Sequence, residues 1–250
     1  MSAATASRLR PRRDPLRLLL SAEPWTAVAY LASYLLVGTG LFVVAVTVLV
    51  TAASLSILWI GIPLLAAAAV LVRGCAEVER GRLRMIAPEP VPRAYLKVTG
   101  PGVSEQVKTR WQDPATRRDV AYLVGMYVPL LVLDAVVFGL WLGFLGGTTV
   151  PLWYWSIPQT FDNGQTAHGL SFGYFPNGPH RHGAIGLWVG DLPAALLAAA
   201  LSLVLLLLLC NYLVVITARV HGRIARALLG PPIDPLAAAK QMLANPGPLA

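Results

Sequence analysis

Long stretches without charge divide the chain into apolar segments. No Asp, Glu, Lys, Arg or His occurs from Pro24 to Val72, and a single helix of that length would reach roughly 74 Å, more than twice the roughly 30 Å of a bilayer's hydrocarbon core. The run must therefore fold back on itself, and small and hydroxyl residues at 51–56 indicate where it breaks. Farther on, 120–161 carries one charge, Asp134, and 192–218 carries none.

These segments predict an all-α membrane protein with four transmembrane helices in two hairpins. The helices are expected over roughly 25–50, 55–73, 119–147 and 190–217. Hydrophobic residues make up 56% of the chain and charged residues 13%, and a mean hydropathy of +0.63 excludes an ordinary soluble domain. The predicted organisation is a basic cytoplasmic segment at 1–23, a four-helix transmembrane domain at 24–230 and a cytoplasmic tail at 231–250.

Positive charges set the expected orientation, because Lys and Arg near the ends of spans are retained in the cytoplasm. Of the 20 Lys and Arg residues, all but Arg181 precede the first segment, lie between the second and third, or follow the fourth. Both termini of this multi-pass cell-membrane protein are therefore predicted to be cytoplasmic, with a short outer turn near residue 52 and a long outer loop at about 148–189. Because the basic residues flank the predicted spans, we interpret the net charge of +8 as a means of contact with membrane lipids rather than with nucleic acid.

Asp134 is the one charged residue inside a predicted span. It lies about 15 residues beyond Asp119, hence roughly 22 Å along the third helix. An intramembrane carboxylate indicates a functional site by default, and Asp134 is a candidate for sensing a ligand or signal. The alternative is a bundle-facing Asp that hydrogen-bonds to neighbouring helices and fixes their packing.

The outer loop holds the other candidate sensing residues. Trp153 and Trp155 belong to an aromatic cluster typical of the headgroup level. His168, His180 and His182 follow, and could supply three imidazoles to zinc or copper or act in pH-dependent signalling. No acidic or Cys partner stands at metal-ligand spacing, so solvent-exposed loop histidines are the simpler interpretation. We predict neither a metal nor another cofactor.

Charged residues continue two of the helices into the cytoplasm. Arg73, Glu79 and Arg80 follow the second helix, and Arg219, Arg223 and Arg226 follow the fourth. One interpretation is a solvated, lipid-facing helix end. The other is signal output, in which a shift of the two helices moves these extensions against a partner.

The two hairpins look like copies of each other. Val28-Ala-Tyr-Leu31 recurs as Val120-Ala-Tyr-Leu123, and Trp59-Ile-Gly61 with Pro63 recurs as Trp188-Val-Gly190 with Pro193. The seven-residue spacing of Arg73 and Arg80 recurs in Arg219 and Arg226. Such internal repeats occur in transporters, whose substrate site lies at the repeat interface.

Four motifs together resemble a known family. They are Ile60-Gly-Ile-Pro-Leu-Leu65, Arg73 with Glu79-Arg80, Trp111 with Asp113-Pro114, and Pro151-Leu-Trp-Tyr-Trp155. Over about residues 16–230 the chain resembles the putative sensor domain found at the N-termini of actinobacterial membrane histidine kinases and as free-standing proteins. The resemblance implies a four-helix membrane input module that is not an enzyme and has no generally assigned ligand.

The leading hypothesis is a non-enzymatic sensor or accessory module that detects an envelope signal. The sequence up to Ala250 has no His-containing dimerisation helix and no ATP-binding domain, so we expect a partner, a histidine kinase or another signalling or transport protein in the membrane. The first alternative is a transporter or permease-associated subunit that uses Asp134 and the repeat interface. The second alternative is an enzyme that acts on lipid and uses Asp134 or the outer histidines. The sequence offers it no paired carboxylates and no nucleophile with an adjacent base.

Overall fold

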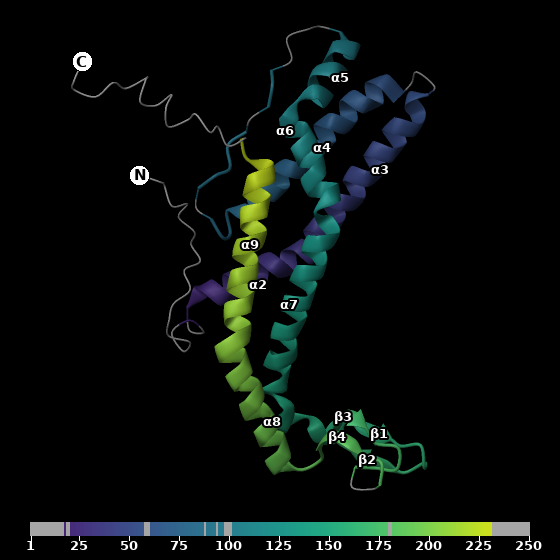
Figure 1. Ribbon diagram of the computed structural model, residues 1–250, viewed down its shortest axis with the longest axis vertical. Coiled ribbons are helices and arrows are strands. Elements are labelled where there is room, and N and C mark those ends of the chain that lie inside the picture. The colour runs from purple at the N-terminus through teal and green to yellow at the C-terminus, as the bar shows by residue number, and fades with distance from the viewer. Residues whose placement is uncertain are drawn as a thin grey trace, which may run out of the picture. The chain divides into compact units, whose positions relative to one another are not determined.

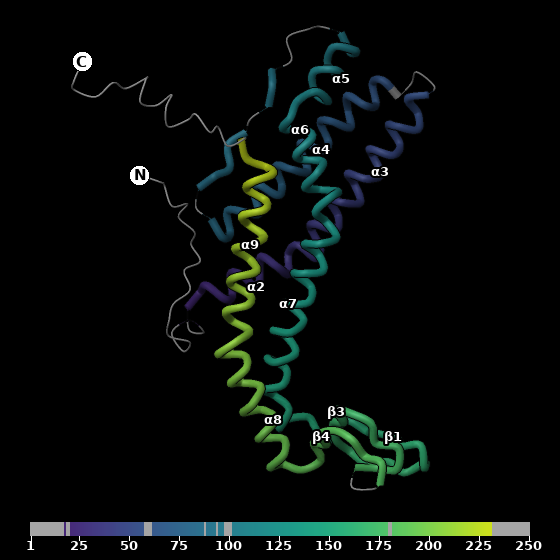
Figure 2. The backbone as a smooth tube through the Cα atoms, in the orientation of Figure 1, coloured from purple at the N-terminus to yellow at the C-terminus, as the bar shows by residue number. Residues whose placement is uncertain are grey.

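The chain is mostly helical in the computed structural model (Figures 1 and 2). The model describes residues 18, 21–57, 61–87, 89–93, 95–97, 102–179 and 182–231. Most of the predicted cytoplasmic segments at 1–23 and 231–250 lies outside the described residues, as does His180. The helices up to the long loop are α2 (Ala22–Ser33), η1 (Tyr34–Gly38), α3 (Thr39–Ser56), α4 (Gly61–Leu83), α5 (Val103–Gln112), α6 (Pro114–Val120), η2 (Ala121–Gly125) and α7 (Tyr127–Gly147). After the loop come α8 (Leu192–Leu205), η5 (Leu206–Cys210) and α9 (Asn211–Leu229).

Three described helices are long and apolar enough to cross a membrane. They cover Ala22–Ser56, Tyr127–Gly147 and Leu192–Leu229, and correspond to the first, third and fourth predicted spans. The third begins at Tyr127 rather than at 119, because a short turn at Met126 separates it from η2.

The second predicted span, 55–73, begins on the last residues of α3, continues through 58–60, which lie outside the described residues, and ends on α4. α4 is apolar up to Val72 and then continues as a charged helix to Leu83. The predicted break at 51–56 is wrong by a few residues: α3 remains helical through Ser56, whose hydroxyl donates to the Ala53 carbonyl oxygen at 2.6 Å.

Within the described residues, three short π-helical turns, η1, η2 and η5, adjoin the long helices. Two of them, η1 and η2, have similar sequences, Tyr34-Leu-Leu-Val-Gly38 and Ala121-Tyr-Leu-Val-Gly125. A π-turn adds one residue to a helical turn and frequently accompanies a functional site. η2 contributes Tyr122, a completely buried residue of the site described below.

The chain packs as two compact units. One consists of Met1–Leu36 with Pro129–Val220, and the other of Val37–Val128 with His221–Ala250. The first unit includes the loop between α7 and α8, and the second includes the charged end of α4 with the end of α9.

The loop between α7 and α8 contains β-strands, so the all-α prediction is wrong for this segment. It begins with two 3-10 turns, η3 (Val150–Leu152) and η4 (Tyr154–Ser156). The strands are β1 (Pro158–Thr160), β2 (Thr166–His168), β3 (Leu170–Tyr174) and β4 (Ile185–Val189). They form two antiparallel two-stranded sheets, β1 with β2 and β3 with β4.

A small hydrophobic core fixes the base of these strands to α8. Val150, Val189 and Ala195 are buried together, and partly buried Trp153 and Leu170 pack against them. Asp191 caps α8, because its Oδ1 accepts the Ala194 backbone N–H at 2.8 Å.

Facing glycines allow β3 and β4 to approach each other closely. Gly173 pairs with Gly186 in the register, and both have positive φ, 142° and 140°. A Cβ on Gly173 would overlap the Ile185 carbonyl oxygen, and one on Gly186 would overlap that of Phe172. Both positions therefore require glycine.

Gly173→Ala is expected to open the β3–β4 pair, because the added methyl group meets backbone rather than a movable side chain. We expect amide hydrogen exchange in 170–174 and 185–189 to accelerate at least tenfold. Gly164→Ala is the matched control, since Gly164 also has positive φ (76°) but has open space around its Cβ position. Equal exchange in the two variants would contradict this account of the glycine pair.

Candidate functional site

The charged end of α4 forms a buried ionic network within the second unit. Asp113 directly follows α5 and caps the start of α6, its Oδ1 accepting the Ala115 backbone N–H at 2.9 Å. Pro114 follows in the first turn of α6, where a missing N–H costs nothing. This capping fixes the Asp113 side chain, whose Oδ2 lies 2.9 Å from Arg73 Nη2.

Arg73 joins α4 to the start of α6. Its Nε donates to Thr116 Oγ1 at 2.9 Å while Nη2 bonds to Asp113. Asp113 and Thr116 are buried. The guanidinium also lies 4.4 Å from the centroid of the Tyr95 ring, a cation–π contact.

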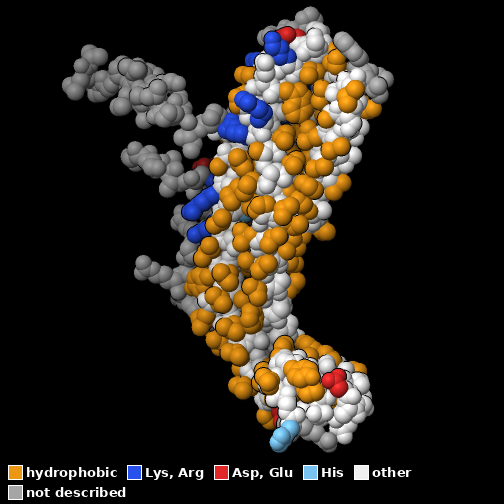
Figure 3. Space-filling view, turned by 45° about the vertical axis from the view of Figure 1, so that its right-hand side comes forward, with side chains coloured by type: hydrophobic (Ala, Val, Ile, Leu, Met, Phe, Trp, Pro, Cys, Tyr) orange, Lys and Arg blue, Asp and Glu red, His pale blue; other side chains and the backbone are white. Residues whose placement is uncertain are grey.

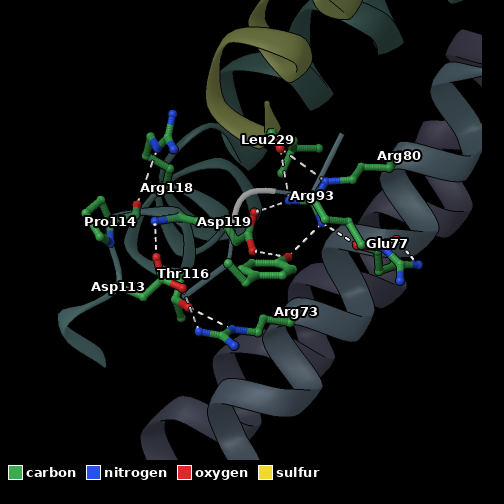
Figure 4. A network of polar contacts seen from close by, with 12 residues as sticks. Arg73, Glu77, Arg80, Arg93, Asp113, Pro114, Thr116, Arg118, Asp119 and Leu229 are labelled. Atoms are coloured by element: carbon green, nitrogen blue, oxygen red, sulfur yellow. Dashed lines mark hydrogen bonds and ion pairs between the residues drawn. The ribbon is translucent and has the colours of Figure 1, made fainter. Parts of the chain in front are cut away.

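Arg80 bonds to groups from four separate parts of the unit, as Figure 4 shows. Its Nη1 donates to Glu77 Oε1 and to the Tyr95 hydroxyl, both at 2.7 Å. Its Nη2 donates to Asp119 Oδ1 at 3.0 Å. Nε and Nη2 both donate to the Leu229 carbonyl oxygen, at 3.1 and 2.9 Å. Arg80 is only 5% exposed, so these contacts replace nearly all of its hydration.

The Leu229 carbonyl is the last of α9, where helical carbonyls have no intrahelical partner. Arg80 satisfies it with a cation, which also suits the negative end of the helix dipole. Residues 149 positions apart in the sequence are thereby joined. We call this set the Arg80 network; it comprises Arg73, Glu77, Arg80, Tyr95, Asp113, Thr116, Asp119 and the Leu229 carbonyl. At its edge the exposed Arg93 donates from Nε to Glu77 Oε2 at 2.9 Å.

A second set of buried, hydrogen-bonded side chains lies on the neighbouring face of α4. Glu79 is completely buried and accepts two hydrogen bonds from Arg82 Nη1, at 2.6 and 2.8 Å. The Tyr122 hydroxyl donates to Glu79 Oε2 at 3.1 Å and lies 3.0 Å from His221 Nε2. Because a hydroxyl has one proton, this arrangement assigns the Nε2 proton to His221 as donor to Tyr122. We call Glu79, Arg82, Tyr122 and His221 the Glu79 cluster.

Burial changes the acidity of two groups in the Arg80 network. Burial raises the pKa of Asp119 to about 6, although the Tyr95 hydrogen bond and the Arg80 charge act in the opposite direction. Burial together with the hydrogen bond to Asp119 raises the pKa of Tyr95 above its usual range. Tyr95 therefore stays protonated and donates to Asp119 Oδ2 at 2.6 Å.

Asp119 is expected to take up a proton as the pH falls through about 6. Because its folded pKa lies above the ordinary 3.8, its contribution to the free energy of unfolding is complete below about 3.8 and is lost as the pH rises through about 6. The two-unit difference corresponds to about 3 kcal/mol. Infrared spectroscopy of the full chain should show a protonated carboxyl band that titrates near pH 6 and is missing in Asp119→Asn. A band that titrates near pH 4 instead would refute the raised pKa.

The structure corrects one interpretation of the sequence. The segment after Arg73 is not a solvated, lipid-facing helix end, because Glu79, Arg80 and Arg82 are all buried against other helices. Of the candidate output residues, Arg73 and Arg80 meet in one network and Glu79 lies in the adjacent cluster. Arg223 is exposed, whereas Arg219 and Arg226 are half-buried. Six further residues of the site were not predicted from the sequence: Tyr95, Asp113, Thr116, Asp119, Tyr122 and His221.

Asp134 lies on α7 in the first unit and is completely buried. This burial fits both alternatives raised by the sequence, a packing carboxylate and a functional one. In the same unit, Trp141 Nε1 of α7 donates to Asn211 Oδ1 of α9 at 3.1 Å, and both residues are buried.

The candidate sensing residues of the loop are spread over its surface. Trp155, His168 and His182 are exposed, and Trp153 is half-buried against the small core. In the part of the chain that the structure describes, no three His, Cys, Asp or Glu side chains lie close enough to hold a metal ion. His180 is outside that part, so the three-imidazole alternative stays a prediction.

The loop also contains an open cavity of about 500 Å³. Its lining combines the Phe161 ring, the amide-bearing residues Gln165 and Asn177, Thr166 and backbone at Gly164 and Gly178. The volume suits a small molecule, and the described residues of the lining carry no charge.

Comparison with protein families gives one match. The family model described as "Sensor: Putative sensor" matches residues 30–229, a region that includes the Arg80 network, the Glu79 cluster and the loop. No curated protein and no solved structure matches the chain.

Proposed function

The chain belongs to the putative-sensor family, and from this premise we propose that it is a non-enzymatic, multi-pass membrane sensor or accessory module. It detects an envelope signal and passes it to a partner protein in the membrane. The partner is a histidine kinase or another signalling protein, as the resemblance to the actinobacterial kinase modules suggests.

The proposed topology has four spans with both termini in the cytoplasm. Three of the spans are the long apolar helices described above, and the apolar part of α4 belongs to the proposed fourth. The positive charges that flank the spans place the loop between α7 and α8 outside. In this orientation the cavity faces the envelope, and the Arg80 network lies at the cytoplasmic end.

The observation that supports signal transfer most strongly is the contact of Arg80 with α9. One buried side chain on α4 holds both Asp119, at the entry to the third span, and the terminal carbonyl of α9. A shift of α9 along α4 would break the bonds to Leu229 and leave the Arg80 charge partly unpaired. Such a contact favours two discrete packings over gradual sliding, as in helix-shift switches.

In-cell crosslinking followed by affinity purification of the tagged full chain and mass spectrometry tests the proposal. A kinase or a response regulator as the major captured protein is the expected result. A permease or transport ATPase would favour the second candidate below, and capture of no protein beyond an untagged control would overturn the role of partner-dependent sensor.

The second candidate function is a transport-related subunit, and the buried Asp134 in a membrane-spanning helix supports it. It predicts that Asp134→Asn abolishes the flux of a solute while membrane insertion and yield stay unchanged. Unaltered solute accumulation in cells carrying Asp134→Asn, measured against a deletion strain, would exclude it.

A further inference from the structure

The β3–β4 pair presents a row of uncovered apolar side chains. The register pairs Phe172 with Leu187 and Tyr174 with Ile185. Paired residues of an antiparallel sheet share a face, and residues two apart on one strand do too, so all four side chains lie on the same face. Their exposed fractions are 61%, 53%, 63% and 74% in the order named. In Figure 3, hydrophobic side chains gather on the visible face of the loop between α7 and α8, which contains the four strands.

This apolar face is continuous with the surface of a membrane-spanning helix. The next pair in the register, Leu170 and Val189, packs on Val150 and on Ala195 of α8. Only two residues separate β4 from α8. The first turns of α8 expose Leu192, Leu196 and Leu197 by 52%, 54% and 70%. All of these residues belong to one compact unit.

We propose that the apolar face of β3–β4 lies in the lipid bilayer, at the boundary between headgroups and acyl chains. Neither strand contains a Lys, Arg, Asp or Glu, so insertion costs no desolvation of charge. Exposed Trp155 and Leu152, at 63% and 75%, extend the same apolar and aromatic character, which is typical of the membrane interface. The open edges of a two-stranded sheet need water or headgroups for their backbone groups, so the face rests at the interface and goes no deeper.

Lipid accounts for this face better than a second copy of the chain. At about 150–200 Å² per large apolar side chain, the four exposed fractions amount to roughly 400–500 Å². A stable protein–protein interface needs about 800 Å² from each partner. A bilayer interface imposes no such minimum, and it is already adjacent wherever α8 enters the membrane.

The inference rests on the membrane placement of α8 in the proposed function, and it adds the outer leaflet as a direct ligand of the sensor loop. Changes in lipid packing or amphiphiles in that leaflet would thereby act on β4 and, two residues later, on the first turn of α8. The absence of charge on the strands also predicts that the contact is independent of headgroup charge.

Fluorescence quenching in nanodiscs tests the contact on the full chain, with the buried Cys75 and Cys210 replaced by Ala. A nitrobenzoxadiazole label is attached at Leu187→Cys, with Ile185→Cys as a second site in case the first variant does not fold. Asp162→Cys is the matched control, an exposed position elsewhere in the loop, and Leu197→Cys reports the membrane placement of α8.

Doxyl-labelled phosphatidylcholine is expected to quench the label at Leu187 at least threefold more than at Asp162, with or without phosphatidylglycerol. Stronger quenching at Leu187 by aqueous iodide than by lipid would overturn the proposal. Protection from both quenchers would overturn it too, because it would assign the face to a protein partner. If Leu197 were also unquenched by lipid, the membrane placement itself would fail, whereas a quenched Leu197 with an unquenched Leu187 would reject the strand contact alone.

Discussion

Arg80→Ala is expected to lower the free energy of unfolding by about 3–5 kcal/mol, because it leaves a buried carboxylate and a buried helix-terminal carbonyl without their shared donor. Asp119 and Leu229 are 0% and 2% exposed, so water replaces the lost bonds only after local opening. Equilibrium denaturation of the full chain in mild detergent measures the loss. Hydrogen exchange should show the opening first at the end of α9.

Arg84→Ala is the control, since Arg84 follows α4 directly, four residues after Arg80, and is exposed. Its substitution should change stability by no more than about 0.5 kcal/mol. If both variants lost equally little stability, Arg80 would not be the residue that holds α4, α6 and α9 together.

Glu79→Ala is expected to lower the free energy of unfolding by a similar amount, about 3–5 kcal/mol. In this variant the buried charge that is removed is negative rather than positive. The substitution removes the buried carboxylate that accepts two hydrogen bonds from Arg82 and one from the Tyr122 hydroxyl. The same denaturation experiment measures the loss. Glu105→Ala is the control, because Glu105 is an exposed glutamate on α5.

A double variant separates the charge effect from simple loss of packing. Arg82→Leu added to Glu79→Ala removes the buried positive charge that Glu79 balances, so the double variant should be more stable than Glu79→Ala alone. A double variant whose losses merely add would show that Glu79 acts by filling space rather than by pairing with Arg82.

The lengths of apolar sequence were sufficient to predict three of the long helices, but not which residues those helices contact. An apolar run longer than a bilayer is thick has few alternatives to a long helix, even where Asp134 interrupts the third segment. The first, third and fourth segments therefore agree with the structure. The strands of 158–189 escaped prediction because the longest has five residues. Glycines interrupt both β3 and β4, so neither shows an uninterrupted apolar and polar alternation.

The buried site could not be read from composition, since a helix end rich in Arg and Glu looks the same whether water or other helices surround it. What decides between the two is contact with distant residues. Arg80 meets a carbonyl 149 positions away, and Tyr122 meets a histidine 99 positions away. One local signal was available in the sequence. Asp113 before Pro114 is a strong helix-capping pair, and a capping carboxylate near several arginines indicates an ion pair.

The measurement that tests the central claim most directly compares partner capture by two variants in the native membrane. Full-length Arg80→Gln and Arg84→Gln are expressed at equal levels, crosslinked in cells and purified with their partners. A signalling protein captured by Arg84→Gln as by the unaltered chain, but reduced at least fivefold with Arg80→Gln, is the predicted result. Equal capture by both variants, or a transport protein as the main partner, would contradict the account of the Arg80 network as the output of a membrane sensor.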